Sequence, residues 1–472
     1  MITFITSIVL LIAGYAFYSK YIERVFGIQS DQPTPAYRCA DGVDYVPLSW
    51  GKIFLIQFLN IAGLGPIFGA IMGATFGPAA FLWIVFGSIF GGAVHDYFSG
   101  MLSIRHDGMS LHGIGEQYMG KAFKQGMSLF TVLLMVLVGA VFVAGPAQLL
   151  SNLTPGSLDF RFWIIVVFAY YVLATLLPID RLIGRIYPLF GLALLFMAVG
   201  ILIALFWNAA PIPELDLFNL HNEKNNPEAY PIFPMMFISI ACGAISGFHA
   251  TQSPMMARCL KHEGMGRRVF YGAMIVEGLV ALIWAAAAMS FFGNTDGLQT
   301  FLTAHGNNAA VVVEEITHSW LGKAGGFLAI LGVIAAPITS GDTAFRSARL
   351  IVSDYFHFAQ KPIKNRLLVA IPLFLAGIAL LNIDFDIIWR YFAWMNQTLA
   401  TATLWIITVF LAKSNKNFWI TLFPALFMSM VISSYIAVAP EGFALSKPIS
   451  YLIGSFFSLV CLMGFARWKR DL

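Results

Sequence analysis

The sequence predicts an all-α protein that crosses a membrane many times. Of its 472 residues, 59% are hydrophobic and only 11% are charged, whereas about a quarter of the residues in soluble domains carry charge. Apolar runs of about 20 residues, the length that spans a bilayer as a helix, recur along the chain. Two of these runs are interrupted near their middle by glycine or proline, which indicates helices that break inside the membrane.

Reading the apolar runs in order gives thirteen expected transmembrane helices. They are 1–19, 52–76, 77–101, 126–150, 160–178, 187–207, 232–257, 269–292, 324–350, 366–382, 388–411, 418–438 and 446–466. The first run lacks a basic segment before it, so we expect a retained helix rather than a signal peptide. No stretch has the composition of a separate soluble domain.

Lys and Arg gather in alternate connections between these helices. With the N-terminus outside, 23 of the 28 basic residues lie on the inner side and 5 on the outer side. Cytoplasmic loops are rich in Lys and Arg, so this predicts a multi-pass membrane protein with an outside N-terminus and a cytoplasmic C-terminus. The lipid bilayer is the expected partner. The net charge of +4 indicates no nucleic-acid partner, and the four scattered cysteines form no disulfide pattern.

The segment 52–76 contains the clearest interruption. Asn60, Gly63, Gly65 and Pro66 lie near its middle, and the backbone groups freed there must be buried in protein or line a wet cavity. Glycines also recur at every fourth position from Gly65, which favours close contact with another helix. A glycine-rich helix with a simple kink is the alternative.

A second, similar interruption indicates an internal repeat. Residues 58–63 read FLNIAG and residues 237–242 read FISIAC, five helices apart and each followed by glycines. An odd number of helices per unit inverts the second unit in the membrane, as in 5+5 inverted-repeat transporters with two broken helices. We therefore expect an N-terminal helix and loop (1–51), two five-helix repeats (52–207 and 232–411) and two accessory helices (412–472).

The two interruptions, at 60–69 and 243–254, are the expected substrate site. Their backbone, with the hydroxyl, amide and imidazole groups beside it, can hydrogen-bond a small carboxylate or a peptide bond. The expected substrate-binding residues are Asn60, Gly63, Gly65, Ser246, Gly247, His249, Thr251 and Gln252. A structural His249 that ties loose backbone together is the alternative.

Ionisable residues inside the spans are candidates for proton coupling or gating, because burying charge in a membrane is costly. They are Asp96, His249, Glu277 and Asp342. His95 and Asp96 are adjacent, so their side chains are expected to point about 100° apart rather than act as a ligand pair. A cytoplasmic Arg such as Arg105 is the alternative partner of Asp96.

Thr339 and Ser340 suggest a different coupling ion. Two hydroxyls together with carbonyls freed at the first break, those of Ala62 and Gly65, make an oxygen cage for Na⁺. The alternative is that the hydroxyls bond back to their own helix. The sequence Glu314–His318 lacks the first His of a metalloprotease helix, and no phosphate-binding loop is present. We therefore expect no enzymatic activity and no cofactor other than the coupling ion, H⁺ or Na⁺.

Four blocks of sequence resemble one known family. YRCADGVDYVPLS (37–49), the long glycine-rich block 60–114, FISIACGAISGFHATQSPMMAR (237–258) and PITSGDTAFRSARLIVSDYF (337–356) are similar to the carbon starvation protein (CstA) family. The resemblance implies a LeuT/APC-like transporter fold in the bacterial inner (plasma) membrane. It also implies ion-coupled uptake of peptides or pyruvate during carbon limitation, by proton symport where coupling has been assigned. The alternative function is an uncoupled channel or facilitator for small anionic metabolites.

Overall fold

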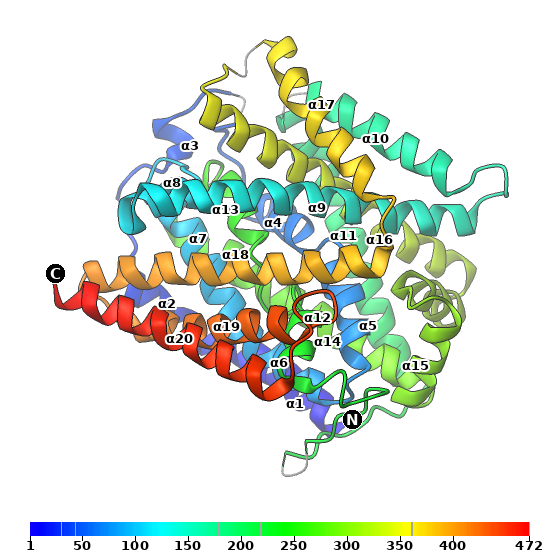
Figure 1. Ribbon diagram of the computed structural model, residues 1–472. Coiled ribbons are helices and arrows are strands. Elements are labelled where there is room, and N and C mark those ends of the chain that lie inside the picture. Colours follow the sequence, from blue (N-terminus) through cyan, green and yellow to red (C-terminus); the bar gives the residue numbers. More distant parts are fainter. Residues whose placement is uncertain (30, 43, 177–178, 218–219, 360–361, 472) are drawn as a thin grey trace.

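A computed structural model describes residues 1–472 apart from 30, 43, 177–178, 218–219, 360–361 and 472 (Figure 1). The described chain is helical, with one isolated β-bridge between Leu48 and Leu260. Among the described residues, ten helices are long and apolar enough to cross a membrane, and a bent pair makes up to eleven.

The first half of the chain contains α1 (Ile2–Ala13), α2 (Ser19–Phe26), α3 (Pro35–Arg38), α4 (Trp50–Ala62), α5 (Ala70–Ala74), α6 (Ala79–Phe86), α7 (Ala93–Arg105), α8 (Leu111–Met119), α9 (Lys121–Leu153), α10 (Phe160–Leu176) and α11 (Ile179–Trp207). The second half contains α12 (Phe237–Ser239), α13 (His249–Ala257), α14 (Gly272–Phe291), α15 (Thr295–Ala304), α16 (Ala309–Phe356), α17 (Ile363–Leu380), α18 (Phe385–Lys413), α19 (Trp419–Val438) and α20 (Lys447–Arg470). Short π-helical segments join several of them: Gly14–Tyr18, Gly65–Gly69, Gly87–Gly92, Ile232–Met236 and Arg267–Tyr271.

Of the thirteen expected spans, ten coincide with long apolar helices of the described chain, and 52–76 coincides with the bent pair. Segment 232–257 is helical only towards its two ends, and the end of 160–178 lies outside the described residues.

Two other expectations were also wrong. The first helix continues beyond residue 19, because a π-helical turn joins α1 to α2, and it ends at the left-handed Gly27 (φ 72°). The connection 293–323 is mostly helical rather than a loop. It contains α15 and the start of α16, where the Asn308 side chain accepts a hydrogen bond from the Ala310 N–H (2.9 Å).

The long helices run side by side across Figure 1, with α3, α8 and the C-terminus at its left end and α15 at its right. The N-terminal ammonium group contacts Glu214 in the connection between α11 and the next helical segment. The N-terminus and this connection therefore lie at the same end of the bundle, as the predicted topology requires.

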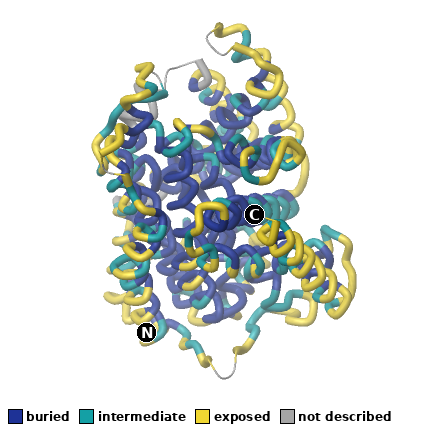
Figure 2. The backbone as a smooth tube through the Cα atoms, turned by 90° about the vertical axis from the view of Figure 1, so that its left-hand side faces the viewer, coloured by how far each residue is buried: buried dark blue, intermediate teal, exposed yellow. Residues whose placement is uncertain are grey.

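Burial separates a central group of helices from a peripheral group. In the apolar stretch that contains α14, 83% of the residues are buried. In the apolar stretches of α17 and α20, only 22% and 17% of the residues are buried. Figure 2 shows the same contrast between a buried interior and exposed outer helices. The outer face of α20 exposes large apolar side chains, including Leu452 and Phe456. Such faces suit contact with lipid.

Candidate functional site

The first expected break is present between α4 and the Gly65–Gly69 turn. The two halves of the span, Trp50–Ala62 and Gly65–Ala74, are bent by 53°. Gly63 lies at the bend with φ 45° and ψ −135°, a conformation that glycine adopts far more readily than other residues. The Asn60 side chain at this break is fully buried, and its two polar atoms have no hydrogen-bond partner among the described residues.

The second break runs from residue 240 to residue 248, between α12 and α13. Asn396 of α18 holds this stretch together. Its Oδ1 accepts a hydrogen bond from the Phe248 N–H (2.7 Å), and its Nδ2 donates to Ser246 Oγ (2.9 Å) and to Cys242 Sγ (3.3 Å). The Gly247 N–H donates to the Asn396 carbonyl (3.0 Å). Ser246 and Gly247 therefore bind Asn396 in this conformation.

The two broken helices lie in direct contact along the predicted glycine stripe. A Cβ atom added to Gly65 would lie 2.0 Å from Cys242 Cβ, and one added to Gly73 would lie 2.2 Å from Ile240 Cγ1. A Cβ atom added to Gly69 would lie 3.0 Å from the Ser239 carbonyl oxygen. The glycines thus allow the second half of the first broken helix to approach the backbone of the second broken helix.

A chain of four buried ionisable side chains lies beside the second break; we refer to it as the relay. Asp96 Oδ1 lies 2.8 Å from His95 Nδ1, and Asp96 Oδ2 lies 2.8 Å from His249 Nδ1. The far side of the His249 ring faces Glu277, with 3.4 Å between Nε2 and Oε2. All four residues have no exposed surface. Carboxylates from α7 and α14 therefore meet at His249, the first residue of α13.

The relay corrects two expectations about Asp96. His95 and Asp96 were expected to point apart, but Asp96 has two carboxylate oxygens and uses one for each imidazole. The alternative pairing with Arg105 was also wrong. Arg105 instead binds Glu263, with Nε–Oε1 at 2.5 Å and Nη2–Oε2 at 3.0 Å.

Ser340 lies against the first break, as expected, but its carbonyl partners differ from the predicted ones. Its hydroxyl is 3.2 Å from the Leu59 carbonyl and 3.1 Å from the Asn60 carbonyl. In a continuous helix these carbonyls would accept from the amides four residues later, so the break leaves them for Ser340. The predicted pair, Ala62 and Gly65, is not contacted by the hydroxyl, and Gly65 abuts Cys242 instead.

The remaining predicted residues lie nearby but outside the relay. Thr339 donates to the Ala336 carbonyl (2.7 Å), which is the back-bonded arrangement. Asp342 accepts from the Tyr187 hydroxyl (3.2 Å) and lies 3.9 Å from Arg346. Gln252 donates to Thr251 Oγ1 (2.8 Å), whereas its own buried Oε1 has no partner in the described structure. The described residues contain no cluster of three or more His, Cys, Asp or Glu that could hold a metal ion.

The model of one protein family, carbon starvation protein CstA, matches residues 1–159 and 151–324 of this chain. The chain belongs to the CstA family. Its sequence is 44% identical over 351 residues to an "Uncharacterized membrane protein" of Haemophilus influenzae, covering 64% of this chain and 95% of that protein. It is 27% identical over 515 residues to the peptide transporter CstA of Bacillus subtilis, covering 88% and 86%. The pyruvate/proton symporter BtsT of Escherichia coli is 28% identical over 349 residues, covering 60% of this chain and 48% of BtsT.

Among solved structures, the chain is similar to MhsT in its complex with L-phenylalanine. The TM-score is 0.58 at 14% sequence identity, covering 88% of this chain and 98% of MhsT. This likeness concerns the fold, and it confirms the prediction of an all-helical protein with a LeuT-like core. The broken helices of this CstA family member thus occupy the centre of a transporter fold.

Two residues of the site were not among the sequence candidates. Asn396 lies beside Gln397 in the mainly apolar segment 388–411, and paired amides inside a span are a signal for hydrogen bonds between helices. His95 was considered only as the neighbour of Asp96. Its role depends on the approach of α13 to α7, which local sequence does not show.

Proposed function

We propose that this chain is a secondary transporter that carries small nutrients, peptides or pyruvate-like carboxylates, into the bacterial cell across the inner membrane during carbon limitation. We further propose that protons drive this uptake. Support for the substrate class comes from the names of the relatives, which are peptide transporters and a pyruvate/proton symporter. Support for coupling comes from the relay, since two buried carboxylates meet at one imidazole beside the broken helices.

The relay suits coupling because its charge changes with each proton it holds. Burial without water makes an uncompensated charge costly, so gaining or losing one proton alters which contacts are favourable. His249 begins α13, so this change acts where the second broken helix resumes. The unpaired polar atoms of Asn60 and Gln252 lie at or next to the two breaks and are suited to hydrogen-bond a substrate.

The test is uptake of labelled pyruvate and of dialanine into proteoliposomes, with H⁺ and Na⁺ gradients imposed separately. We expect accumulation with an inward H⁺ gradient alone. Glu277→Gln should abolish this accumulation but keep substrate exchange at equal concentrations on both sides, because exchange needs no net proton movement. Asp296→Asn is the control. It neutralises an exposed carboxylate outside the relay, so it should keep proton-driven accumulation.

Na⁺ is the second candidate ion, favoured by the Ser340 hydroxyl beside two carbonyls of the first break. Accumulation that needs inward Na⁺ and is lost in Ser340→Ala would replace the proton proposal with this one. Uptake that continues unchanged after both gradients are collapsed would contradict coupling and favour a channel or facilitator.

A further inference from the structure

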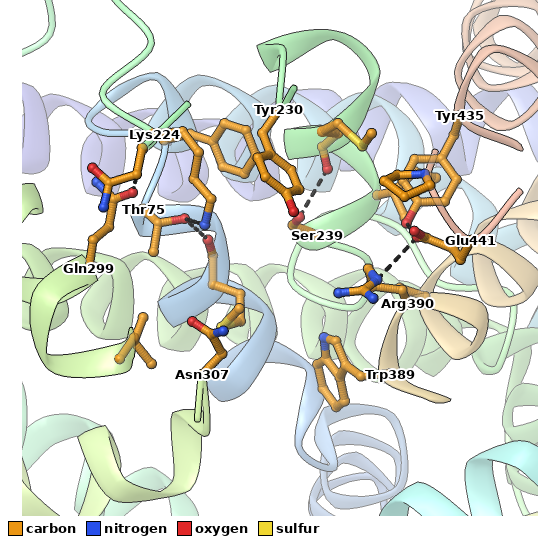
Figure 3. Close-up of a pocket in the computed structure, with 18 of the residues that line it drawn as sticks. Thr75, Lys224, Tyr230, Ser239, Gln299, Asn307, Trp389, Arg390, Tyr435 and Glu441 are labelled. Atoms are coloured by element: carbon orange, nitrogen blue, oxygen red, sulfur yellow. Dashed lines mark hydrogen bonds and ion pairs between the residues drawn. The ribbon is translucent and has the colours of Figure 1, made fainter. Parts of the chain in front are cut away.

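A polar cavity of about 230 Å³ lies at the end of the bundle that holds α15, which is the outer side in the proposed topology (Figure 3). Its wall combines the end of the first broken helix span, at Thr75, with the residue that ends α12, Ser239. The start of α18 supplies Trp389 and Arg390. Because both broken helices form its wall, the cavity lies next to the proposed substrate site.

Two cations and one carboxylate face this cavity. Lys224 Nζ donates to Thr75 Oγ1 (2.9 Å) and lies over the rings of Phe76 and Tyr230, 5.6 Å and 5.7 Å from their centroids. On the opposite wall, Arg390 Nε lies 3.2 Å from Glu441 Oε1. The cavity therefore carries an excess of one positive charge, which favours an anion.

Glu441 is already well supplied with partners. Its Oε1 also accepts from the Tyr435 hydroxyl, and the carboxylate side chain is only 7% exposed. Arg390, by contrast, engages Glu441 through Nε, and its terminal nitrogens extend into the cavity in Figure 3. The planar outer edge of the guanidinium is the part that binds a carboxylate with two parallel hydrogen bonds.

Trp389 provides a further unused donor. Its side chain is more than nine-tenths buried, and its indole Nε1 has no hydrogen-bond partner among the described residues. In Figure 3 the indole nitrogen points towards Arg390. A buried donor without a partner is uncommon in a folded protein, so a ligand that accepts from it is a physical explanation for its placement.

We propose that this cavity is an outer docking site for the carboxylate group of an incoming substrate, with Arg390 and Trp389 as its donors. Lys224, on the opposite wall, adds attraction for the same charge. This inference rests on the proposed function and deepens it, because it gives the transporter a preference for carboxylate-bearing substrates before they reach the broken helices. Glu441 competes with the substrate for Arg390.

The site is tested by chemical protection, which needs no transport. A Thr303→Cys variant places a thiol on the cavity wall, and a membrane-impermeant maleimide added outside intact proteoliposomes labels it. The protein without this substitution serves as the control, because its labelling comes from the native cysteines alone. We expect pyruvate to slow the labelling and its neutral amide, pyruvamide, to have no effect. Arg390→Gln should raise the pyruvate concentration for half-protection about 10-fold or more, and Trp389→Phe should raise it several-fold.

Three further variants separate docking from a purely structural role of Arg390. Lys447→Gln removes a positive charge that is paired with Glu228 and does not line the cavity, so it should leave protection unchanged. Glu441→Gln should strengthen protection, because Arg390 loses its competitor. If Arg390 served only to neutralise Glu441, Arg390→Gln/Glu441→Gln would restore protection; docking predicts that this double variant stays weak.

The two proposals fail in different ways. Specific protection by pyruvate in a protein that shows no uptake would keep the docking site and refute the proposed function. If Arg390→Gln changes neither the KM of uptake nor the protection by pyruvate, the docking site is refuted and the proposed function remains intact.

Discussion

Gly65 of the first broken helix packs directly against Cys242 of the second. A Cβ atom on Gly65 would lie 2.0 Å from Cys242 Cβ and 2.4 Å from Cys242 Sγ. Gly65 belongs to the first interruption that the sequence predicts, Cys242 directly precedes the second, and both are buried. The contact leaves no room for a side chain at residue 65. It therefore fixes how closely the first broken helix can approach the second.

We predict that Gly65→Ala destabilises the protein and stops transport. The added methyl group must displace Cys242 and the backbone of the second break, and overfilling of this kind costs about 1–3 kcal/mol. The thermal unfolding midpoint in detergent and substrate exchange in proteoliposomes measure the two effects. Gly464→Ala is the control, because a Cβ atom there meets nothing within 4 Å. A stable, active Gly65→Ala protein would contradict the contact, and Cys242→Gly should partly rescue the variant.

The sequence predicted the architecture well because each signal was local. Apolar length marked the spans, and Gly63 with Pro66 marked the first break without any knowledge of neighbouring helices. The similarity of 237–242 to 58–63 located the second break, but the expected range, 243–254, began three residues too late and included six residues that are helical. His249 itself begins α13.

The partners inside the site were harder to predict, because they depend on contacts between distant segments. Asp96 and His249 are 153 residues apart, and their contact follows from the approach of α13 to α7. The carbonyl partners of Ser340 were placed a few residues too late, since they depend on where α4 stops. Helical periodicity indicates which face a residue occupies, not which neighbour that face meets.

We predict that the Arg105–Glu263 ion pair holds the end of the bundle opposite α15. Glu263 is 4% exposed, and it also accepts from the Gln29 N–H (2.6 Å), so it joins three separate segments. Glu263→Gln leaves Arg105 partly buried without its counter-ion, which should cost about 2–4 kcal/mol. Arg105→Gln should do similar damage, and the double variant should lose about 1–3 kcal/mol less than the two single losses together.

Thermal unfolding midpoints of the two single variants and the double variant measure this coupling. Asp471→Asn serves as the control, because Asp471 and Arg470 form an exposed pair in which both side chains are more than half exposed. Strictly additive losses at Arg105 and Glu263 would show that the pair contributes nothing beyond its separate parts.

His112, in α8 outside the spans, gives a prediction about acid. Burial, reinforced by the nearby Lys124, lowers the pKa of His112 from its ordinary value of 6.5 to about 4. As the pH falls from 6.5 towards 4, the histidine takes up a proton in the unfolded chain but stays neutral in the folded protein. The free energy of unfolding therefore decreases over this pH range, and it is unaffected by the protonation of His112 above pH 6.5. The loss attributable to His112 should reach about 2 kcal/mol at pH 5.

His112→Gln should therefore unfold less steeply with acid than the native chain between pH 7 and pH 5, as measured by unfolding midpoints across that range. His305→Gln, which replaces an exposed histidine on the far end of the bundle, should leave the slope unchanged. Parallel curves for the native chain and His112→Gln would refute the assignment.

Asn396 should prove essential for the shape of the second break. Its side chain accepts from the Phe248 N–H and donates to Ser246 and Cys242, so Asn396→Ala leaves buried polar groups without partners. The expected cost is about 2–4 kcal/mol, since each unsatisfied buried group costs about 1–3 kcal/mol. Thr398→Ala, on the same helix, removes only a bond to its own backbone and should be nearly neutral. Because residues 240–248 keep few helix-type hydrogen bonds, such as the one from the Ile245 N–H to the Ala241 carbonyl (2.9 Å), Asn396→Ala should also lose substrate exchange at temperatures where it remains folded. Exchange at the native rate in folded Asn396→Ala would show that the break keeps its shape without this side chain.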